Sequence, residues 1–201
     1  GIKFPEDAQY LLLIDISSTH ESLDKKLNEA AEILKSTDIL GMRITKDPEE
    51  MAVMYQARKG LYSSQLSERE KPGDYVIIGD IVVPASRLPK TLSEIKGSIE
   101  NYGLKVALFG HIGDGNIHAN IFADINNSEQ MKRVNDFMME LGRIALRNEG
   151  SVSSEHGIGI EKIELLKEEY RYKNSLKNLD IMREIKKIFD PKNILNRGKM
   201  F

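Results

Sequence analysis

The amino-acid sequence predicts an α+β fold in which a mixed or antiparallel β-sheet is covered by helices. Short apolar runs of strand length alternate with longer segments of helical periodicity along most of the chain. Two of the strand-like runs follow each other across a glycine-rich turn, which predicts a β-hairpin. With 201 residues the chain is long enough to bury a hydrophobic core and fits one large domain or two small ones, and it contains no internal repeat. We therefore expect a single domain over residues 1–201, with a helical extension at its C-terminal end.

The first third of the chain predicts two strands, each followed by a helix. Residues 10–16 are a continuous apolar run, and Ser18 and Glu21 have the spacing of a capping box that opens a helix. A second strand is expected at residues 39–45. Asp47 directly precedes a proline, and this order predicts an N-cap followed by the second helix.

The rest of the chain predicts three further strands and several helices. In order, the expected elements are a strand at 75–83, a helix from Ser86 to Gly103, strands at 104–110 and 116–123, a helix around 131–144, a loop at 151–159 and helical segments up to Phe189. Helices interleaved with a hairpin are typical of a mixed sheet with helices packed on it.

Composition and charge exclude several classes of function. The formal net charge is −2 and the isoelectric point is about 6.2, so we expect neither nucleic acid nor an anionic membrane as a partner. No apolar run reaches the length of about 18 residues that a membrane-spanning helix needs. Cysteine is absent, so a bound metal ion must rely on His, Asp and Glu. We expect a cytoplasmic location, with peripheral membrane association as the alternative.

The most informative stretch contains two of the four histidines, His111 and His118, on either side of a glycine-rich turn. Asp114 and Gly115 have the composition of a two-residue type I′ hairpin loop. In that register His111 lies directly opposite His118, with Cβ atoms about 4.5–5.5 Å apart, and the two imidazoles can share one metal ion. A longer loop would break this pairing. The structural alternative is a pair of hydrogen-bonded core histidines.

A third metal ligand is expected from residues 153–159, where Glu155 and His156 lie in a glycine-containing loop. Two histidines and one glutamate with an open coordination position suit catalytic Zn²⁺, and also accept Mn²⁺ or Fe²⁺. Adjacent residues of an extended loop point in opposite directions. We therefore expect one of these two side chains to be a ligand and the other an acid–base group, and a hydrogen-bonded or helix-capping loop is the structural alternative.

These motifs together resemble the C-terminal domain of FAD-linked oxidases of the vanillyl-alcohol oxidase superfamily. The relevant branch contains the glycolate oxidases, the D-lactate dehydrogenases and the D-2-hydroxyglutarate dehydrogenases. The most specific match is the His-Ile-Gly-Asp-Gly-Asn-Ile-His element at residues 111–118. Residues 154–159 and the tail 189–199 also match, and residues 80–89 and 57–59 match less specifically. The segments occur in the family's order and cover most of the chain.

The resemblance implies a function and a set of site residues. It implies a ferredoxin-like α+β core that caps the flavin and binds a D-2-hydroxy acid, whose hydride passes to FAD. His111, His118 and Glu155 would bind a divalent metal, Zn²⁺ or Mn²⁺. His156 would take the hydroxyl proton, and Arg58 would pair with the substrate carboxylate.

The tail and the N-terminal end depart from the family's pattern. Arg197 stands where the family usually has proline, and the neighbouring Asn196, together with Asn116, would approach the substrate or the flavin. The glycine-rich flavin-pyrophosphate motif does not occur before Phe4, so the FAD-binding domain is expected in cis outside this chain or as a separate subunit. Alone, the chain is expected to bind no FAD and to turn over no substrate.

Two functions of other classes are alternatives. A self-contained hydrolase would use a His–His–Glu metal to activate water, but the sequence contains no phosphate loop and no nucleophile elbow. A non-catalytic ferredoxin-like binding module would keep both hairpin histidines for structural reasons. The sequence names neither the particular 2-hydroxy acid nor the electron acceptor, the metal or the oligomeric state.

Overall fold

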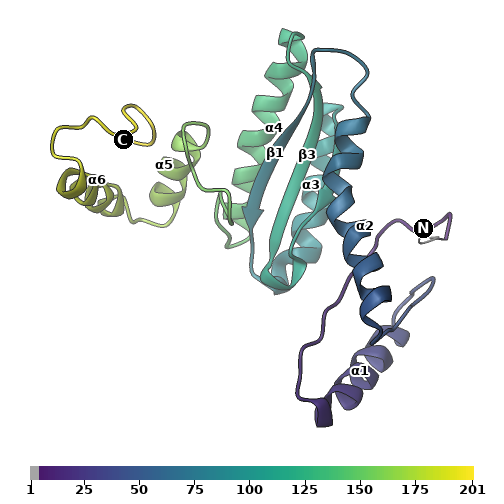
Figure 1. Ribbon diagram of the computed structural model, residues 1–201. Helices are drawn as coiled ribbons and strands as arrows, with labels where there is room; N and C mark the ends of the chain where they lie inside the picture. The colour runs from purple at the N-terminus through teal and green to yellow at the C-terminus, as the bar shows by residue number, and fades with distance from the viewer. Residues whose placement is uncertain (1–4) are drawn as a thin grey trace. The chain divides into compact units, whose positions relative to one another are not determined.

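The structure is a computed structural model that describes residues 5–201, and the chain forms two compact units. The N-terminal unit is Gly1–Glu68, and the sheet unit is Arg69–Phe201. In the N-terminal unit, helix α1 spans His20–Lys35 and helix α2 spans Pro48–Ser67 (Figure 1). Each of these helices follows an extended segment.

The two helices of the N-terminal unit begin in different ways. Asp47 caps α2 as predicted, because its side chain accepts hydrogen bonds from two backbone N–H groups of the first turn at 2.7 and 3.1 Å. The capping box predicted at Ser18 is wrong. Thr19 is the N-cap of α1 and makes no side-chain capping bond, while the Ser18 hydroxyl lies 2.6 Å from that of Ser22. A hydroxyl that bonds to another hydroxyl in the turn is not available to cap the helix.

The two strands predicted in the N-terminal unit are not formed. Residues 10–16 and 39–45 are extended, but neither pairs with another strand within residues 5–201. Their apolar side chains stay accessible, with Leu12 55% and Leu40 59% exposed. A strand needs a neighbour whose N–H and C=O groups complete the ladder, and apolar composition alone does not supply that neighbour.

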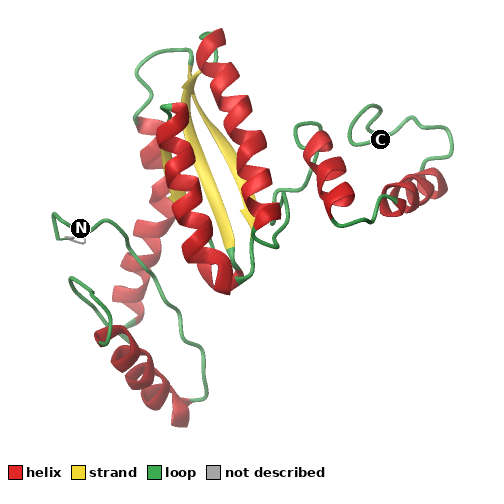
Figure 2. Ribbon diagram, turned by 180° about the vertical axis from the view of Figure 1, so that it is seen from behind, coloured by secondary structure: helices red, strands yellow, loops and turns green. Residues whose placement is uncertain are grey.

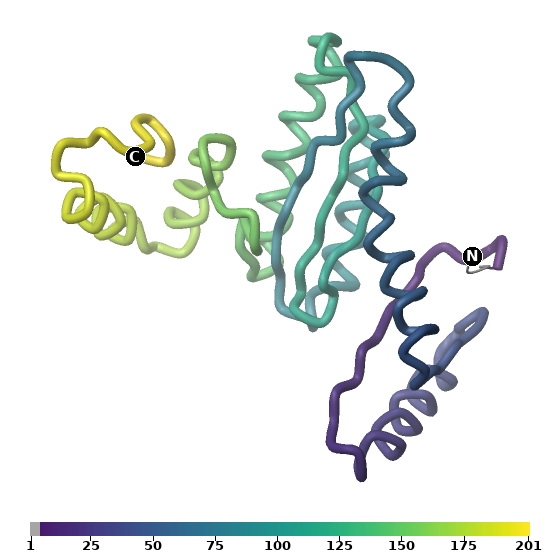
Figure 3. Tube along the Cα trace, in the orientation of Figure 1, coloured from purple at the N-terminus to yellow at the C-terminus, as the bar shows by residue number. Residues whose placement is uncertain are grey.

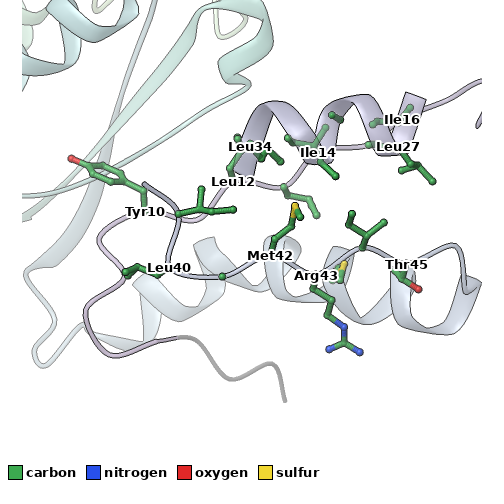
Figure 4. A pocket seen from close by; sticks show the side chains of 18 of the residues that line it. Tyr10, Leu12, Ile14, Ile16, Leu27, Leu34, Leu40, Met42, Arg43 and Thr45 are labelled. Atoms are coloured by element: carbon green, nitrogen blue, oxygen red, sulfur yellow. The ribbon is translucent and has the colours of Figure 1, made fainter. Parts of the chain in front are cut away.

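Both extended segments line a cavity of about 680 Å³ together with the two helices (Figure 4). Side chains of the first segment such as Ile14, of α1 such as Leu34, and of the second segment such as Met42 line it. Among the described residues of the N-terminal unit, only Ala31 is an apolar residue buried in the core. The interior of this unit is therefore loosely filled.

The sheet unit contains a three-stranded antiparallel sheet with the strand order β1-β3-β2. The strands are β1 (Asp74–Val82), β2 (Lys105–Phe109) and β3 (Asn116–Asp124), close to the predicted ranges. The central strand β3 pairs with β1 along its whole length, and this register places Asp80 opposite His118.

Helices α3 (Leu88–Tyr102) and α4 (Ser128–Arg147) lie across one face of this sheet (Figure 2). The core lies between the helices and the sheet, and includes Ile117, Ile121 and Phe137, each at most 2% exposed. Because side chains alternate along a strand, Ala119 also faces this core, whereas His118 and Asn120 of β3 lie on the opposite face. The predicted α+β class, with an antiparallel sheet covered by helices, is confirmed.

The ends of α3 show one wrong and one correct prediction. Ser86 does not cap α3, because it lies in a short 3-10 helix, η1 (Ala85–Arg87), and the N-cap is Arg87. The tighter turn of η1 carries the chain into the helix without a side-chain cap. Gly103 ends α3 as predicted, since its left-handed φ of 58° closes the last turn.

Helices α5 (Ile163–Tyr172) and α6 (Lys177–Phe189) form the predicted C-terminal extension (Figure 3). An irregular tail follows, and the carboxylate of Asp190 accepts hydrogen bonds from two backbone N–H groups within it. Within residues 5–201 the helices are all too short or too polar to cross a membrane.

Candidate functional site

The two histidines of the hairpin lie close together, but not in the predicted register. His118 pairs with Phe109 rather than with His111, and a loop of residues 110–115 connects β2 to β3. The two-residue type I′ turn is therefore wrong. Only the last residue of the loop is left-handed, since its φ is 77°, while the residues before it form the 3-10 helix η2 (Ile112–Asp114).

The loop is held by hydrogen bonds that residue spacing does not reveal. The side-chain oxygen of Asn116 accepts the backbone N–H of His111 at 3.0 Å, and the carbonyl of Gly115 accepts the N–H of Val83 at 3.0 Å. A Cβ atom on Gly115 would lie 1.8 Å from the Val83 oxygen, so this position requires glycine. These bonds stabilise a wider loop in place of the tight turn.

His111, His118 and Glu155 form a group whose ligand atoms all lie within 4.8 Å of one another. Glu155 Oε1 lies 2.8 Å from His118 Nε2, and Glu155 Oε2 lies 3.7 Å from His111 Nδ1. The His118 side chain is 7% exposed, whereas the other two are close to half exposed. The structure thus brings together the three residues predicted as ligands. His118 is buried, and the side of the group formed by His111 and Glu155 is open to solvent.

His156 packs against the same group. Its ring stacks on that of His118, with centroids 4.8 Å apart and 16° between the planes. Its Nε2 atom lies 3.9 Å from Glu155 Oε1. The expectation that the adjacent residues 155 and 156 point in opposite directions is wrong, because both side chains reach His118. The loop is not extended there, since its successive N–H groups turn toward one acceptor.

That acceptor is Asp80, a fully buried residue of β1 that motif spacing does not indicate. Its Oδ2 atom accepts four hydrogen bonds of 2.9–3.1 Å, from the Ser153 hydroxyl and from the backbone N–H groups of Ser154, Glu155 and His156. Its Oδ1 atom accepts the side-chain N–H of Asn116 at 2.9 Å. A carboxylate inside the otherwise apolar run 76–83 is the sequence signal that points to this residue.

Asp80, His118 and His156 also come close enough to one another to form a metal-binding group. Both carboxylate oxygens of Asp80 already accept hydrogen bonds. A cation at Asp80 would have to displace these donors, whereas the carboxylate of Glu155 points to the solvent-open side. His111, His118 and Glu155 are therefore the better ligand set.

Lys162 supplies the buried counter-charge of Asp80. Its Nζ atom lies 3.8 Å from Asp80 Oδ2 and donates hydrogen bonds to the backbone carbonyls of Asp80 and Val152 at 2.6 and 3.0 Å. Burial alone would raise the pKa of Asp80, but the loop N–H groups and the Lys162 charge outweigh it and hold the pKa below its usual value. Burial lowers the pKa of Lys162, and the Asp80 charge opposes this shift.

The surroundings of His118 favour its neutral form. Burial lowers the pKa of the imidazole, and the nearby Asp80 charge opposes this shift. Neutral imidazole is the form that binds a metal ion. The buried Nδ1 atom has no hydrogen-bond partner in the described part of the chain, and lies 3.5 Å from Asp80 Oδ1. Two imidazoles and one carboxylate are a donor set that fits Zn²⁺ or Mn²⁺.

The other predicted site residues differ in their surroundings. Asn116 is 2% exposed and uses both ends of its amide within the protein, so it positions the loop of His111. Asn196 is exposed in the C-terminal tail, with a left-handed φ of 47°. Arg58 is exposed on α2 in the N-terminal unit. The substrate or flavin contacts of these three residues stay predictions.

The sheet unit is therefore an antiparallel sheet whose central strand carries His118, one member of a His–His–Glu group with metal-binding chemistry. Comparison with known families then assigns the chain more closely. The chain belongs to the family described as FAD linked oxidases, C-terminal domain, whose model matches residues 1–200. This assignment confirms the resemblance inferred from the motifs.

Curated relatives carry names from the same branch. The chain is 32% identical over 200 residues to glycolate oxidase subunit GlcD of Bacillus subtilis, covering 100% of this chain and 41% of the relative. It is 30% identical over 189 residues to a probable mitochondrial D-lactate dehydrogenase of Danio rerio, covering 94% of this chain and 37% of the relative. The chain therefore spans about two-fifths of the length of these relatives.

A solved structure supports the fold. The chain is similar to 4-ethylphenol oxidase from Gulosibacter chungangensis, in an isoeugenol complex, with a TM-score of 0.62. The match covers 90% of this chain and 36% of that one, at 17% sequence identity. At this level of identity the likeness shows a shared fold.

Proposed function

We propose that this chain is the substrate- and metal-binding domain of a flavin-dependent 2-hydroxyacid dehydrogenase or oxidase of the glycolate or D-lactate type. The observation that carries the proposal is the convergence of His111, His118 and Glu155 beside His156. The names of the relatives, a glycolate oxidase subunit and a probable D-lactate dehydrogenase, support the same class of substrate. Residues 1–201 are proposed to act as one domain.

His111, His118 and Glu155 are proposed to hold one divalent cation, Zn²⁺ or Mn²⁺. Bound there, the cation would acidify the 2-hydroxyl group of the substrate. The hydroxyl and carboxylate groups of the substrate would chelate the cation together. His118 is the buried anchor of this group, and the two more exposed ligands leave one side accessible to a small acid.

His156 is proposed to accept the hydroxyl proton. Its side chain is 43% exposed and lies beside the ligand group without belonging to it, which suits a base that exchanges protons with solvent. Arg58 is proposed to pair with the substrate carboxylate, since a guanidinium offers two parallel donors. Asn116 and Asn196 are proposed to lie near the substrate or the flavin.

The hydride of the substrate C2 atom is proposed to pass to FAD held mainly by another domain, in cis or as a separate subunit. The electron pair would leave with the hydride and the proton would go to His156, so that a 2-hydroxy acid would become a 2-oxo acid. A purified chain that carries flavin absorbance and reduces a dye with D-lactate would contradict the placement of the flavin in another domain. Metal-dependent hydrolysis of a generic ester by the chain alone would favour a hydrolase instead.

Zn²⁺ and Mn²⁺ titration by calorimetry tests the metal site, with the metal-stripped chain as reference. We expect one site per chain, and a loss of affinity on the order of a hundredfold in His118→Ala and in Glu155→Ala. His20 is exposed at the start of α1, so His20→Ala is the matched control and should bind as the parent chain does. Undiminished binding in both site variants, or no binding by the parent chain, would overturn the proposed site.

A further inference from the structure

We propose that Asp80 is the positioning residue of this site, whose buried carboxylate holds Glu155 and His156 against His118, with Lys162 as its counter-charge. The catalytic meaning of this inference rests on the proposed function. Its geometric content does not, because every contact involved lies within the sheet unit.

The first step of the argument is the register of the sheet. Asp80 of β1 pairs with His118 of β3, so both side chains point to the face of the sheet opposite α3 and α4. Asp80 is 0% exposed, and its Oδ1 atom lies 3.5 Å from His118 Nδ1. Two rigid neighbouring strands therefore fix the carboxylate next to the buried imidazole.

The second step is the capture of the loop that follows Val152. Three successive backbone N–H groups, those of residues 154–156, converge on Asp80 Oδ2. Successive N–H groups that turn toward one oxygen form an anion-binding concavity, and here the anion belongs to the protein. This arrangement brings the side chains of Glu155 and His156 to the same side, where both meet His118.

The third step links the same carboxylate to the hairpin loop. Asp80 Oδ1 accepts one N–H of the Asn116 amide, and the oxygen of that amide accepts the backbone N–H of His111. The Asp80 side chain thus bonds directly to the backbone of Glu155 and reaches His111 through Asn116. It reaches the third predicted ligand, His118, through the backbone N–H of His156, whose ring stacks on that of His118. Supporting bonds of this kind set the orientation of metal ligands in proteins.

Lys162 explains how the site tolerates a buried negative charge. Its side chain is 8% exposed, and its Nζ atom donates hydrogen bonds to the backbone carbonyls of Asp80 and Val152. Val152 directly precedes the loop that Asp80 holds. Loss of either partner would leave an uncompensated buried charge. Asp80 and Lys162 therefore act as one unit that joins β1 to the loop.

Asp80→Asn tests the inference, with Asp74→Asn as the matched control. Asp74 lies on the same strand and its carboxylate also accepts two backbone N–H groups, those of Glu70 and Lys71, at 3.0 and 3.1 Å. An amide at position 80 is a weaker acceptor and turns its NH₂ group toward N–H donors. Only the loop held by Asp80 contains predicted site residues.

The first measurement is amide hydrogen exchange by NMR in the full, metal-free chain. We expect Asp80→Asn to accelerate exchange at residues 154–156 on the order of tenfold, because their common acceptor is weakened. Asp74→Asn should leave these three amides unchanged and accelerate Glu70 and Lys71 instead. Unchanged exchange at residues 154–156 in a folded Asp80→Asn chain would overturn the inference.

The second measurement is Zn²⁺ affinity by calorimetry. We expect Asp80→Asn to weaken Zn²⁺ binding by about 10–100-fold, and Asp74→Asn to leave it unchanged. A carboxylate with a merely structural role would lower the melting temperature without changing the Zn²⁺ affinity of the folded chain. That result would also overturn the inference.

A milder variant covers the case in which Asp80→Asn does not fold. Ser153→Ala removes one of the four donors to Asp80 Oδ2, and should accelerate exchange at residues 154–156 by about threefold. No acceleration in this variant would overturn the inference. Absence of Zn²⁺ binding in the parent chain would overturn the proposed metal site, while the exchange measurement would still decide the role of Asp80.

Discussion

The two units of the chain contain apolar, strand-like segments of similar composition that end in different states. In the sheet unit, Ile117 and Ile121 of β3 are at most 2% exposed, and every residue of β3 has a partner in β1. In the N-terminal unit, Leu12 and Ile14 are 55% and 47% exposed, in a segment that has no ladder among the described residues. A similar local sequence is thus a strand in one unit and an unpaired extended segment in the other.

The difference shows what a strand needs beyond its own sequence. β3 has two neighbouring strands that complete its hydrogen bonds, and two helices that cover its apolar face. Residues 10–16 have no neighbouring strand in the described part of the chain, and they border a cavity of about 680 Å³ together with α1 and α2. Only the sheet unit therefore provides a rigid base, and the histidine group lies on it.

A pair of isoleucine variants tests this comparison with the largest expected effect. Ile121→Ala should lower the free energy of unfolding by about 2–5 kcal/mol, because it leaves a cavity in a closely packed core. Ile14→Ala should cost less than about 1 kcal/mol, because the side chain is already half exposed. Urea unfolding followed by circular dichroism measures both. Equal losses would show that the two segments are packed equally well.

A pair of glycine variants is expected to have the next largest effect. Gly115→Ala should lower the free energy of unfolding by about 1–3 kcal/mol, because φ is 77° and the new Cβ atom would meet the Val83 carbonyl. A Cβ atom on Gly41, in the second extended segment, would have no heavy atom within 4 Å. Gly41→Ala should therefore be neutral or stabilise by up to about 1 kcal/mol. Thermal unfolding of both variants decides, and a destabilising Gly41→Ala would contradict the open surroundings of that residue.

The smallest predicted effect is the contribution of His118, in the sheet unit, to the pH dependence of stability. Burial lowers the pKa of His118 in the folded chain below its ordinary value of 6.5, so the unfolded chain binds its proton first as the pH falls. The free energy of unfolding of the metal-free chain should therefore decrease as the pH falls from 6.5 toward the folded pKa. Above that ordinary value this contribution is fully present.

His118→Gln should reduce this pH dependence, because glutamine does not titrate. Urea unfolding is measured about every half pH unit between about pH 7.5 and pH 5. These data give the change of the free energy of unfolding with pH in both chains. An identical slope in the parent chain and in the variant would show that the buried imidazole is not its source.

Local features of the fold were predictable because their causes lie within a few residues. The caps at Asp47 and Gly103 follow from side-chain reach and from glycine conformation, and both are confirmed. The hairpin register was not predictable, because the Asn116 side chain holds the backbone of His111 and stabilises a wider loop. The His111–His118 pair nevertheless forms, since a loop of either length returns the chain to the same end of the sheet.

By itself, the sequence determined the helical and strand-like segments, the α+β class, the family and the residues with metal-binding chemistry. These properties depend on residue type, short spacing and periodicity, which a linear pattern contains. Only the tertiary structure decided which apolar segments pair as strands, and which residue supports the histidine group. Asp80 bonds to residues 73–76 positions later in the chain, and contacts at that separation exist only after β1, β3 and the loop have come together.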